Sequence, residues 1–234
     1  MVKTNGGYLI LGRHAESERN DTKRNHGFFV SRKERDKLMG APDHLIPLTP
    51  LGKEQAQHMG GVLRERFPVP TQITHSGYRR TIETTHGILA AYTSREYDQV
   101  YVTWSHLIRE RHAGYGFEML DVEADIYFPW LQRYWKTWKN MFATPPGGES
   151  IITTADREVS FLQALEARFR ADPTRTEFVI GHGIGHHALR FLIEKWTYVE
   201  ADEHYKQGPL PNCGMVAYKY LPHQGFVKTD ESGA

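Results

Sequence analysis

The chain has 234 residues, and its 29 lysines and arginines nearly balance its 28 aspartates and glutamates. This length suits one large α/β domain, so we expect a single domain over residues 1–234. The balanced charge argues against a protein that binds nucleic acid or membranes by bulk electrostatics. One cysteine, Cys213, leaves no partner for an internal disulfide, and no apolar run is long enough for a secretory leader or a membrane span. We therefore expect a cytoplasmic protein.

The first predicted element is a short buried strand over residues 9–11, which Gly12 ends. Arg13 and His14 follow at once, so the carboxyl end of this strand carries two basic side chains. Open α/β sheets bind ligands at that edge, and a helix that begins just beyond would direct its amide groups to the same place. For this stretch alone, an ordinary surface pair in a loop is the alternative.

Residues 21–43 show no clean hydrophobic period and carry charges of both signs. Such a segment is usually a solvated insertion. Long irregular segments in compact domains are also often functional, so a basic flap over an anionic substrate is the second interpretation. The sequence leaves both open.

A helix and a second strand come next. Thr49 and Pro50 are typical of a helix start, and apolar residues then recur at spacings of three and four. These residues are Ala56, Met59, Leu63 and Phe67. Residues 73–76 form a short strand, and a helix with an apolar side begins near Arg80. That side consists of Ile82, Leu89 and Tyr92. Arg79 and Arg80 therefore lie at a second strand end.

The middle of the chain combines a third strand with an aromatic insertion. Residues 100–104 form the strand, and the charged segment after it contains Glu110. Residues 113–145 are typical of a helical insertion and are rich in aromatic rings. These rings either pack under the insertion or form a stacking wall for a substrate.

The last third of the chain predicts a long helix, a buried strand, a second helix and a final strand. The apolar face of the long helix consists of Ala155, Val159, Leu162, Leu165 and Phe169. The strands cover residues 177–180 and 215–220, the second helix covers 184–196, and a loose tail is expected from about residue 222. The alternation of strands and helices favours a three-layer α/β/α sandwich with a mostly parallel sheet.

Predicted strand ends place several reactive side chains at one edge of this sheet. Arg13 and His14, Arg80 and His182 each follow a strand, and Glu110 follows another. Two arginines and two histidines suit a phosphoryl dianion, because the arginine fork donates two parallel hydrogen bonds. A neutral histidine can attack phosphorus, and a nearby carboxylic acid can protonate the leaving oxygen.

Six segments in this order resemble the motifs of the histidine phosphatase superfamily, also called phosphoglycerate-mutase-like. The matching segments are residues 13–15, 48–56, 76–84, 109–114, 146–150 and 181–183. The resemblance runs from residue 8 to about residue 220, and residues 181–220 look most like the broad-range phosphatase branch. One such motif is weak evidence, whereas six in register are specific.

The resemblance implies a role for each matched residue. His14 is the nucleophile that becomes phosphorylated, and Glu110 is the general acid and later the base for water. Arg13, Arg80 and the catalytic His182 hold the phosphoryl oxygens. The motif spacing selects Arg80 rather than Arg79, which is expected at the surface or rim. The other implied phosphate-binding residues are Ser17, Asn20 and Gly183. Should Glu110 only shape the pocket, the next acids to consider are Glu16 and Glu118.

The implied activity is that of a metal-independent phosphomonoesterase of the histidine acid phosphatase type. It would need no cofactor and would act on a small phosphorylated metabolite. The sequence does not name that metabolite, and it leaves the oligomeric state open, a homodimer included.

Three alternatives remain. A cofactor-dependent phosphoglycerate-type mutase stays open because Glu110-Arg111-His112 is close to the mutase pattern. A catalytically weak module that binds a phospholigand or a protein on the same fold is the rival of another class. Zinc on His182, His186 and His187 is a third, although the spacing lacks the glutamate that a zincin requires. Ala15 and Gly77 replace the family's usual glycine and proline, and neither change removes a catalytic side chain.

Overall fold

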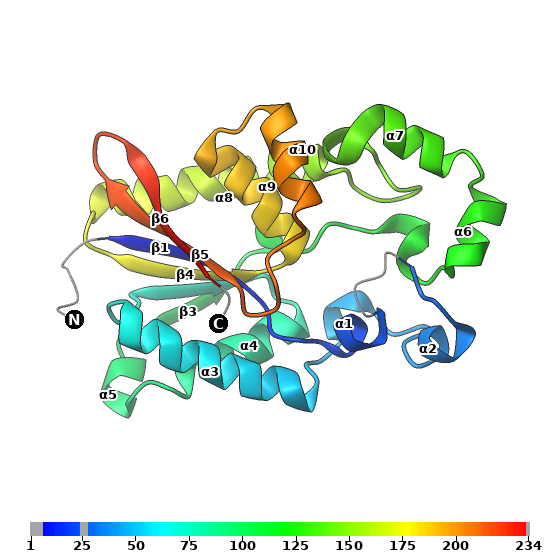
Figure 1. The fold of residues 1–234 in the computed structure, drawn as a ribbon. Helices are drawn as coiled ribbons and strands as arrows, with labels where there is room; N and C mark the ends of the chain where they lie inside the picture. The colour runs from blue at the N-terminus through cyan, green and yellow to red at the C-terminus, as the bar shows by residue number, and fades with distance from the viewer. Residues whose placement is uncertain (1–6, 24–27, 233–234) are drawn as a thin grey trace.

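Six strands form one mixed sheet in a computed structural model that describes residues 7–23 and 28–232 (Figure 1). The strands are β1 (Tyr8–Arg13), β2 (Gln72–His75), β3 (Tyr101–Trp104), β4 (Thr176–Gly181), β5 (Met215–Leu221) and β6 (Gly225–Ser232). Their order is β3-β2-β4-β1-β5-β6; the first four are mutually parallel, and β5 and β6 are antiparallel to their neighbours. The predicted mostly parallel sheet is therefore confirmed.

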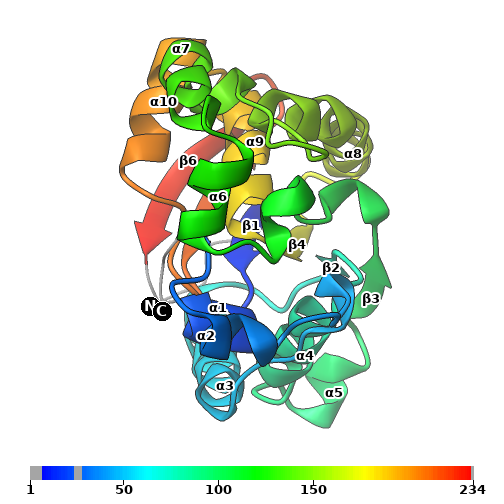
Figure 2. The same ribbon diagram turned by 90° about the vertical axis from the view of Figure 1, so that its right-hand side faces the viewer.

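Helices cover both faces of this sheet (Figures 1 and 2). The longer helices are α3 (Pro50–Arg66), α4 (Arg79–Leu89), α7 (Leu131–Phe142), α8 (Ile151–Ala171), α9 (Gly183–Glu194) and α10 (Tyr198–Lys206). The shorter helices are α1 (Glu18–Lys23), α2 (Arg32–Asp36), α5 (Ser94–Tyr97) and α6 (Asp121–Tyr127), with 3-10 turns η1 (Asp43–Leu45), η2 (His106–Ile108) and η3 (Gly114–Phe117). None of the helices in the described ranges is both long and apolar enough to cross a membrane.

The alternation of β1 divides the core into two layers. Ile10 packs with α3 and α4 residues such as Met59, whereas Leu9 and Leu11 pack with α8 residues such as Leu165 on the opposite face. Successive side chains of a strand point to opposite faces, so a sheet covered on both sides needs this continuous apolar run. The predicted α/β/α sandwich follows from it.

Two predicted helix faces differ from those in the structure. Val159 of α8 is 37% exposed, and its neighbour Phe161 is buried instead. In α4, Ile82 is only half-buried, while the buried face carries the threonines Thr81, Thr84 and Thr85. Each hydroxyl of these threonines donates to a carbonyl three or four residues earlier, which is how a polar face can be buried.

The prediction of a loose tail from residue 222 is wrong for the described residues. Residues 225–232 form β6, which pairs with β5 in an antiparallel hairpin. Gly225 adopts a left-handed backbone in the turn (φ +80°), and the Phe226 ring packs edge-on against both Phe169 and Tyr220. An edge strand buries little, so polar composition did not reveal it.

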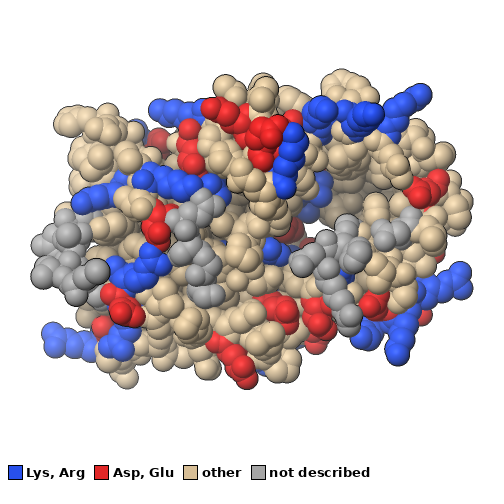
Figure 3. Space-filling view, viewed as in Figure 1, with Lys and Arg blue, Asp and Glu red and all other residues tan. Residues whose placement is uncertain are grey.

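The two predicted insertions meet outside the sheet. In residues 21–43 the structure describes the end of α1, then α2 and the start of η1, while residues 24–27 lie outside the described part. Residues 113–145 are helical, as predicted, and form η3, α6 and α7. Phe29 and Leu120 form a bridge between the two insertions and pack with Leu38 in a small core. Side chains of both charge signs occur over the face of the molecule seen in Figure 3.

Candidate active site

The pairing of β1 with β4 brings the two predicted histidines together. Arg13 and Gly181 are partners at the last position of this parallel ladder, so His14 and His182 leave the sheet side by side. Their ring centroids are 5.2 Å apart at an interplanar angle of 67°. Both side chains are buried, so neither is an exposed side chain on a surface loop.

The His14 ring has one nitrogen committed and one free. Its Nδ1 lies 2.7 Å from the carbonyl oxygen of Ala15. Because a carbonyl can only accept, Nδ1 carries the hydrogen and Nε2 carries the lone pair. Burial, then the charges of Arg80 and Arg13, hold the pKa of His14 well below its usual value. The ring is therefore neutral and can act as a nucleophile at Nε2.

The His182 ring is tied to a hydroxyl chain that sequence analysis does not single out. Its Nε2 lies 2.8 Å from Ser76 Oγ, which lies 3.0 Å from Thr81 Oγ1. The Thr81 hydroxyl donates to the carbonyl of Tyr78, so Ser76 donates to Thr81 and His182 Nε2 donates to Ser76. Nδ1 of His182 is buried and has no hydrogen-bond partner among the described residues. Burial lowers the pKa of His182 well below its usual value.

The two predicted phosphate arginines are held in different ways. Arg13 donates from Nη1 to the carbonyl of Leu210 at 2.6 Å, and its buried Nε has no partner among the described residues. Arg80 has a side chain only 4% exposed and places its guanidinium 4.7 Å from the Tyr78 ring centroid. Both Nη atoms of Arg80 face the carboxylate of Asp43, at 3.0 and 3.4 Å. Asp43 was not among the predicted site residues.

Glu110 lies beside these groups, at the end of the segment that follows η2. Its Oε1 accepts the backbone N–H of Arg111 at 2.8 Å, and its Oε2 lies 3.9 Å from His182 Nδ1. Burial raises the pKa of Glu110 above its usual value, although the Arg111 amide and Arg80 oppose the shift. The carboxyl group can therefore keep a proton for transfer.

One cavity of about 950 Å³ joins most of the predicted residues. Its lining includes Arg13, His14, Ser17, Asn20, Arg80 and Glu110. The Ser17 amide and hydroxyl both donate to Asn20 Oδ1, at 3.1 and 2.8 Å, so Ser17 orients Asn20 in the cavity wall. Asn212 donates to the same oxygen at 3.2 Å. Lys23 and Asp43 of the 21–43 insertion line this cavity. The insertion therefore contributes side chains of both charge signs to the cavity wall.

Gly183 is not among the residues that line this cavity, although it lies beside Arg13. It is the first residue of α9 and lines a neighbouring, smaller cavity. A Cβ at this position would lie 2.9 Å from Pro209 Cβ and 3.6 Å from Arg13 Cζ. The glycine therefore allows the close approach of the loop after α10 and of Arg13.

The remaining predicted candidates have structural partners. Arg79 is exposed and pairs with Glu83, as expected for a surface residue. Glu16 accepts the Thr49 hydroxyl at 2.7 Å, and Glu118 accepts the Gly40 amide at 2.7 Å. Neither carboxylate approaches the histidine pair as Glu110 does.

The three histidines considered for zinc face different partners. The described residues contain no group of three His, Cys, Asp or Glu side chains arranged to hold a metal ion. His186 donates from Nε2 to the carbonyl of Gly12 at 2.8 Å, and burial lowers its pKa to about 4. The His187 ring packs against Trp196 and Tyr205. His186 thus holds the end of β1 in place.

Comparisons with known proteins agree on one family and fold. A sequence model of the histidine phosphatase superfamily (branch 1) matches residues 9–230. The mycobacterial glucosyl-3-phosphoglycerate phosphatase is similar over 97% of this chain and 99% of its own, with a TM-score of 0.71 and 21% identity. Bacillus stearothermophilus YhfR is similar over 97% and 98%, with a TM-score of 0.73 and 17% identity.

A phosphoserine phosphatase from Entamoeba histolytica, solved with 3-phosphoglyceric acid, has a TM-score of 0.67 and 18% identity over 97% of this chain and 98% of its own. At these identities the structural likeness shows the fold. No curated protein sequence matches the chain.

Proposed function

The chain belongs to the histidine phosphatase superfamily, and we propose that it is a metal-independent phosphomonoesterase that forms a phosphohistidine at His14. The main support is the neutral His14 ring, whose Nδ1–H is committed to a carbonyl while Nε2 keeps its lone pair. The buried Arg13 Nε and His182 Nδ1, which lack partners among the described residues, are the kind of polar groups that a phosphoryl oxygen satisfies. A small phosphorylated metabolite is the proposed substrate, and the single buried thiol of Cys213 fits a cytoplasmic location.

In the proposed first step, His14 displaces the leaving group from phosphorus. Nε2 forms a bond to phosphorus as the bond to the leaving oxygen breaks, and that oxygen takes the proton of Glu110. Arg13 and Arg80 bind the charged phosphoryl oxygens. His182 Nδ1 accepts the hydrogen of a phosphate monoanion or takes up a proton when a dianion binds.

In the second step, water replaces the histidine. The Glu110 carboxylate takes a proton from the attacking water, the new oxygen–phosphorus bond forms, and the bond to Nε2 breaks. The electron pair returns to Nε2, so the ring is neutral again and inorganic phosphate leaves. The Ala15 carbonyl stabilises the positive ring of the intermediate through Nδ1–H.

The test is to trap the phosphoenzyme. The purified protein is mixed with ethyl phosphate in EDTA and quenched in alkali, where a phosphorus–nitrogen bond survives. We expect turnover, and a mass increase of one phosphoryl group on the peptide that contains His14. His14→Ala should lose the label, and His182→Ala should form it slowly.

Other outcomes would each refute a different part of the proposal. Turnover that vanishes in EDTA and returns with zinc or magnesium would refute the metal-independent mechanism. Label lost in His182→Ala but kept in His14→Ala would reverse the two roles. Exchange of the two monophosphoglycerates far faster than phosphate release would identify a mutase.

A further inference from the structure

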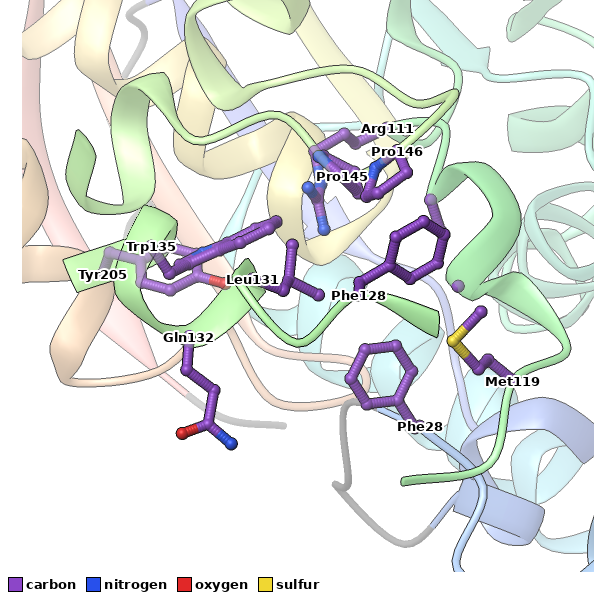
Figure 4. Close-up of a pocket in the computed structure, with 12 residues that line it drawn as sticks. Phe28, Arg111, Met119, Phe128, Leu131, Gln132, Trp135, Pro145, Pro146 and Tyr205 are labelled. Carbon is purple, nitrogen blue, oxygen red and sulfur yellow. The ribbon is translucent and has the colours of Figure 1, made fainter. Parts of the chain in front are cut away.

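A second cavity, of about 340 Å³, lies beside the catalytic one and differs from it in character (Figure 4). Its wall is mostly aromatic and aliphatic and contains Phe28, Met119, Phe128, Leu131, Trp135 and Tyr205. Phe28 comes from the 21–43 insertion, and the other residues come from the 113–145 insertion and α10. Arg111 is the one charged residue among the described residues that line it.

The two cavities share a wall next to the proposed general acid. Arg111 and Ala113 line both of them. Arg111 directly follows Glu110 and donates its backbone N–H to the Glu110 carboxylate. In the proposed reaction the leaving oxygen must lie at that carboxylate. The rest of the leaving group therefore emerges where the apolar cavity begins.

Backbone hydrogen bonds hold this shared wall in a fixed shape. His112 and Glu149 are joined twice, from the His112 amide to Glu149 Oε2 and from the Glu149 amide to the His112 carbonyl, both at 2.9 Å. The Tyr115 amide donates to the Pro146 carbonyl at 2.9 Å. Gly114 makes this contact possible, since it adopts φ +64° and any Cβ there would lie 2.1 Å from the Pro146 oxygen. These contacts hold the shared side of the cavity in place.

We propose that this apolar cavity binds the body of the leaving group, so that the preferred substrate is the phosphomonoester of an alcohol bearing one or two fused rings. The proposal rests on the proposed phosphatase function and names its substrate class. A cavity of this volume accepts such a ring system, and flat rings pack well against aromatic walls. Arg111 is the charged residue of this wall: its guanidinium donates from Nη1 to the Glu149 carbonyl at 3.2 Å, and its buried Nε, which has no hydrogen-bond partner among the described residues, is a donor that a polar atom of the bound group can satisfy.

The experiment compares two alkyl phosphates with similar leaving groups. Ethyl phosphate and 2-(1-naphthyl)ethyl phosphate both release a primary alkoxide, so the chemical step is matched and the ring system is the difference. We expect kcat/KM to be roughly 100-fold higher for the naphthyl ester, in the range that apolar pockets achieve.

Variants of α7 locate the effect. Trp135→Ala and Leu131→Glu should each lower the ratio of the two kcat/KM values roughly tenfold or more, because one removes an aromatic wall and the other adds a charge. Trp138→Ala is the matched control, since Trp138 is 55% exposed on the same helix and is not in the cavity lining. It should leave the ratio unchanged.

Hydrolysis of ethyl phosphate reports the proposed function separately and shows that each variant is folded. Hydrolysis of neither ester would refute the phosphatase itself. Equal kcat/KM values for the two esters, or a ratio that Trp135→Ala and Leu131→Glu do not change, would overturn the apolar subsite while the phosphatase stands.

Discussion

The catalytic cavity and the apolar cavity beside it are built by different parts of the chain. The histidine pair lies at the ends of β1 and β4, where the register of a parallel ladder fixes both positions. The apolar cavity is made by η3, α7 and α10 together with Phe28, all outside the sheet. The sheet therefore positions the proposed catalytic residues, while the segments outside the sheet line the cavity proposed to select the leaving group.

The two regions also influence each other electrostatically. Burial lowers the pKa of His14 and raises that of Glu110, so burial favours the neutral form of both groups. The wall of the apolar cavity begins one residue after Glu110, at Arg111. A substrate ring bound in the apolar cavity would bury the Glu110 carboxyl group further. Selectivity and acid strength are thus expected to be linked.

The largest effect should come from the catalytic cavity itself. His14→Ala removes the nucleophile, and we expect kcat to fall by about 10⁴-fold or more, as in other enzymes that lose one. The loss should be the same for ethyl and naphthylethyl phosphate, because the apolar cavity is untouched. Steady-state phosphate release measures it, with exposed His86→Ala as the control. Residual turnover within tenfold of wild type would exclude His14 as the nucleophile.

The next effect should depend on the leaving group. Glu110→Gln cannot donate a proton, and general acid catalysis is worth about 10²–10⁴-fold. That loss is expected for ethyl phosphate and should be far smaller for p-nitrophenyl phosphate, whose phenolate departs unprotonated. Both rates are measured on the same preparations. Equal losses on the two esters would mean that Glu110 only shapes the pocket.

The pH profile should change in the same variant. Because the pKa of Glu110 is raised, the acid keeps its proton above the usual carboxyl range and loses it as the pH rises further. The rate on ethyl phosphate should therefore fall on the alkaline side, and Glu110→Gln should remove that limb. The lowered pKa of His14 keeps the nucleophile neutral on the acidic side. An alkaline limb that survives in Glu110→Gln would assign it to another group.

A smaller effect is expected from Asp43, which the 21–43 insertion contributes to the catalytic cavity. The Asp43 carboxylate occupies the fork of Arg80 that a phosphoryl group would use. Asp43→Asn removes a competing charge, and we expect inorganic phosphate to inhibit about fivefold more tightly, near the upper limit for a partly exposed ion pair. The exposed Asp21→Asn in the same cavity is the control. Weaker inhibition would show that Asp43 positions Arg80 rather than competing for it.

The smallest effect should be on stability alone. Glu158 of α8 is buried, and burial raises its pKa well above the usual value despite Arg157 nearby. As the pH rises above the pKa of the unfolded chain, only the unfolded state ionises, so the native state loses stability. Glu158→Gln should remove this loss and raise Tm at pH 8 by about 2–4 °C, and by less at pH 5. Thermal unfolding tests it against the exposed Asp156→Asn; a lower Tm at pH 8 would show that the native carboxyl is ionised.

The sequence alone predicted the sheet, the order of its elements and the side chains that meet at its edge. The apolar run of β1, the Thr49 cap and the residues after each strand are local signals, because strand ends and helix starts depend on neighbouring residues. These local signals, together with the resemblance to the family's motifs, select Arg13, His14, Arg80, Glu110 and His182 as candidate site residues. Their proposed roles remain to be tested by the variants above.

The tertiary structure decided the features that depend on residues far apart in the chain. Asp43 on the fork of Arg80, the inward face of Trp135 and the pairing of β6 are contacts that no local period encodes. The direction of the Glu110 pKa could not be derived from its flanking arginines, which favour the ionised form. Burial determined it, and burial is the sum of every segment that packs around the carboxyl group.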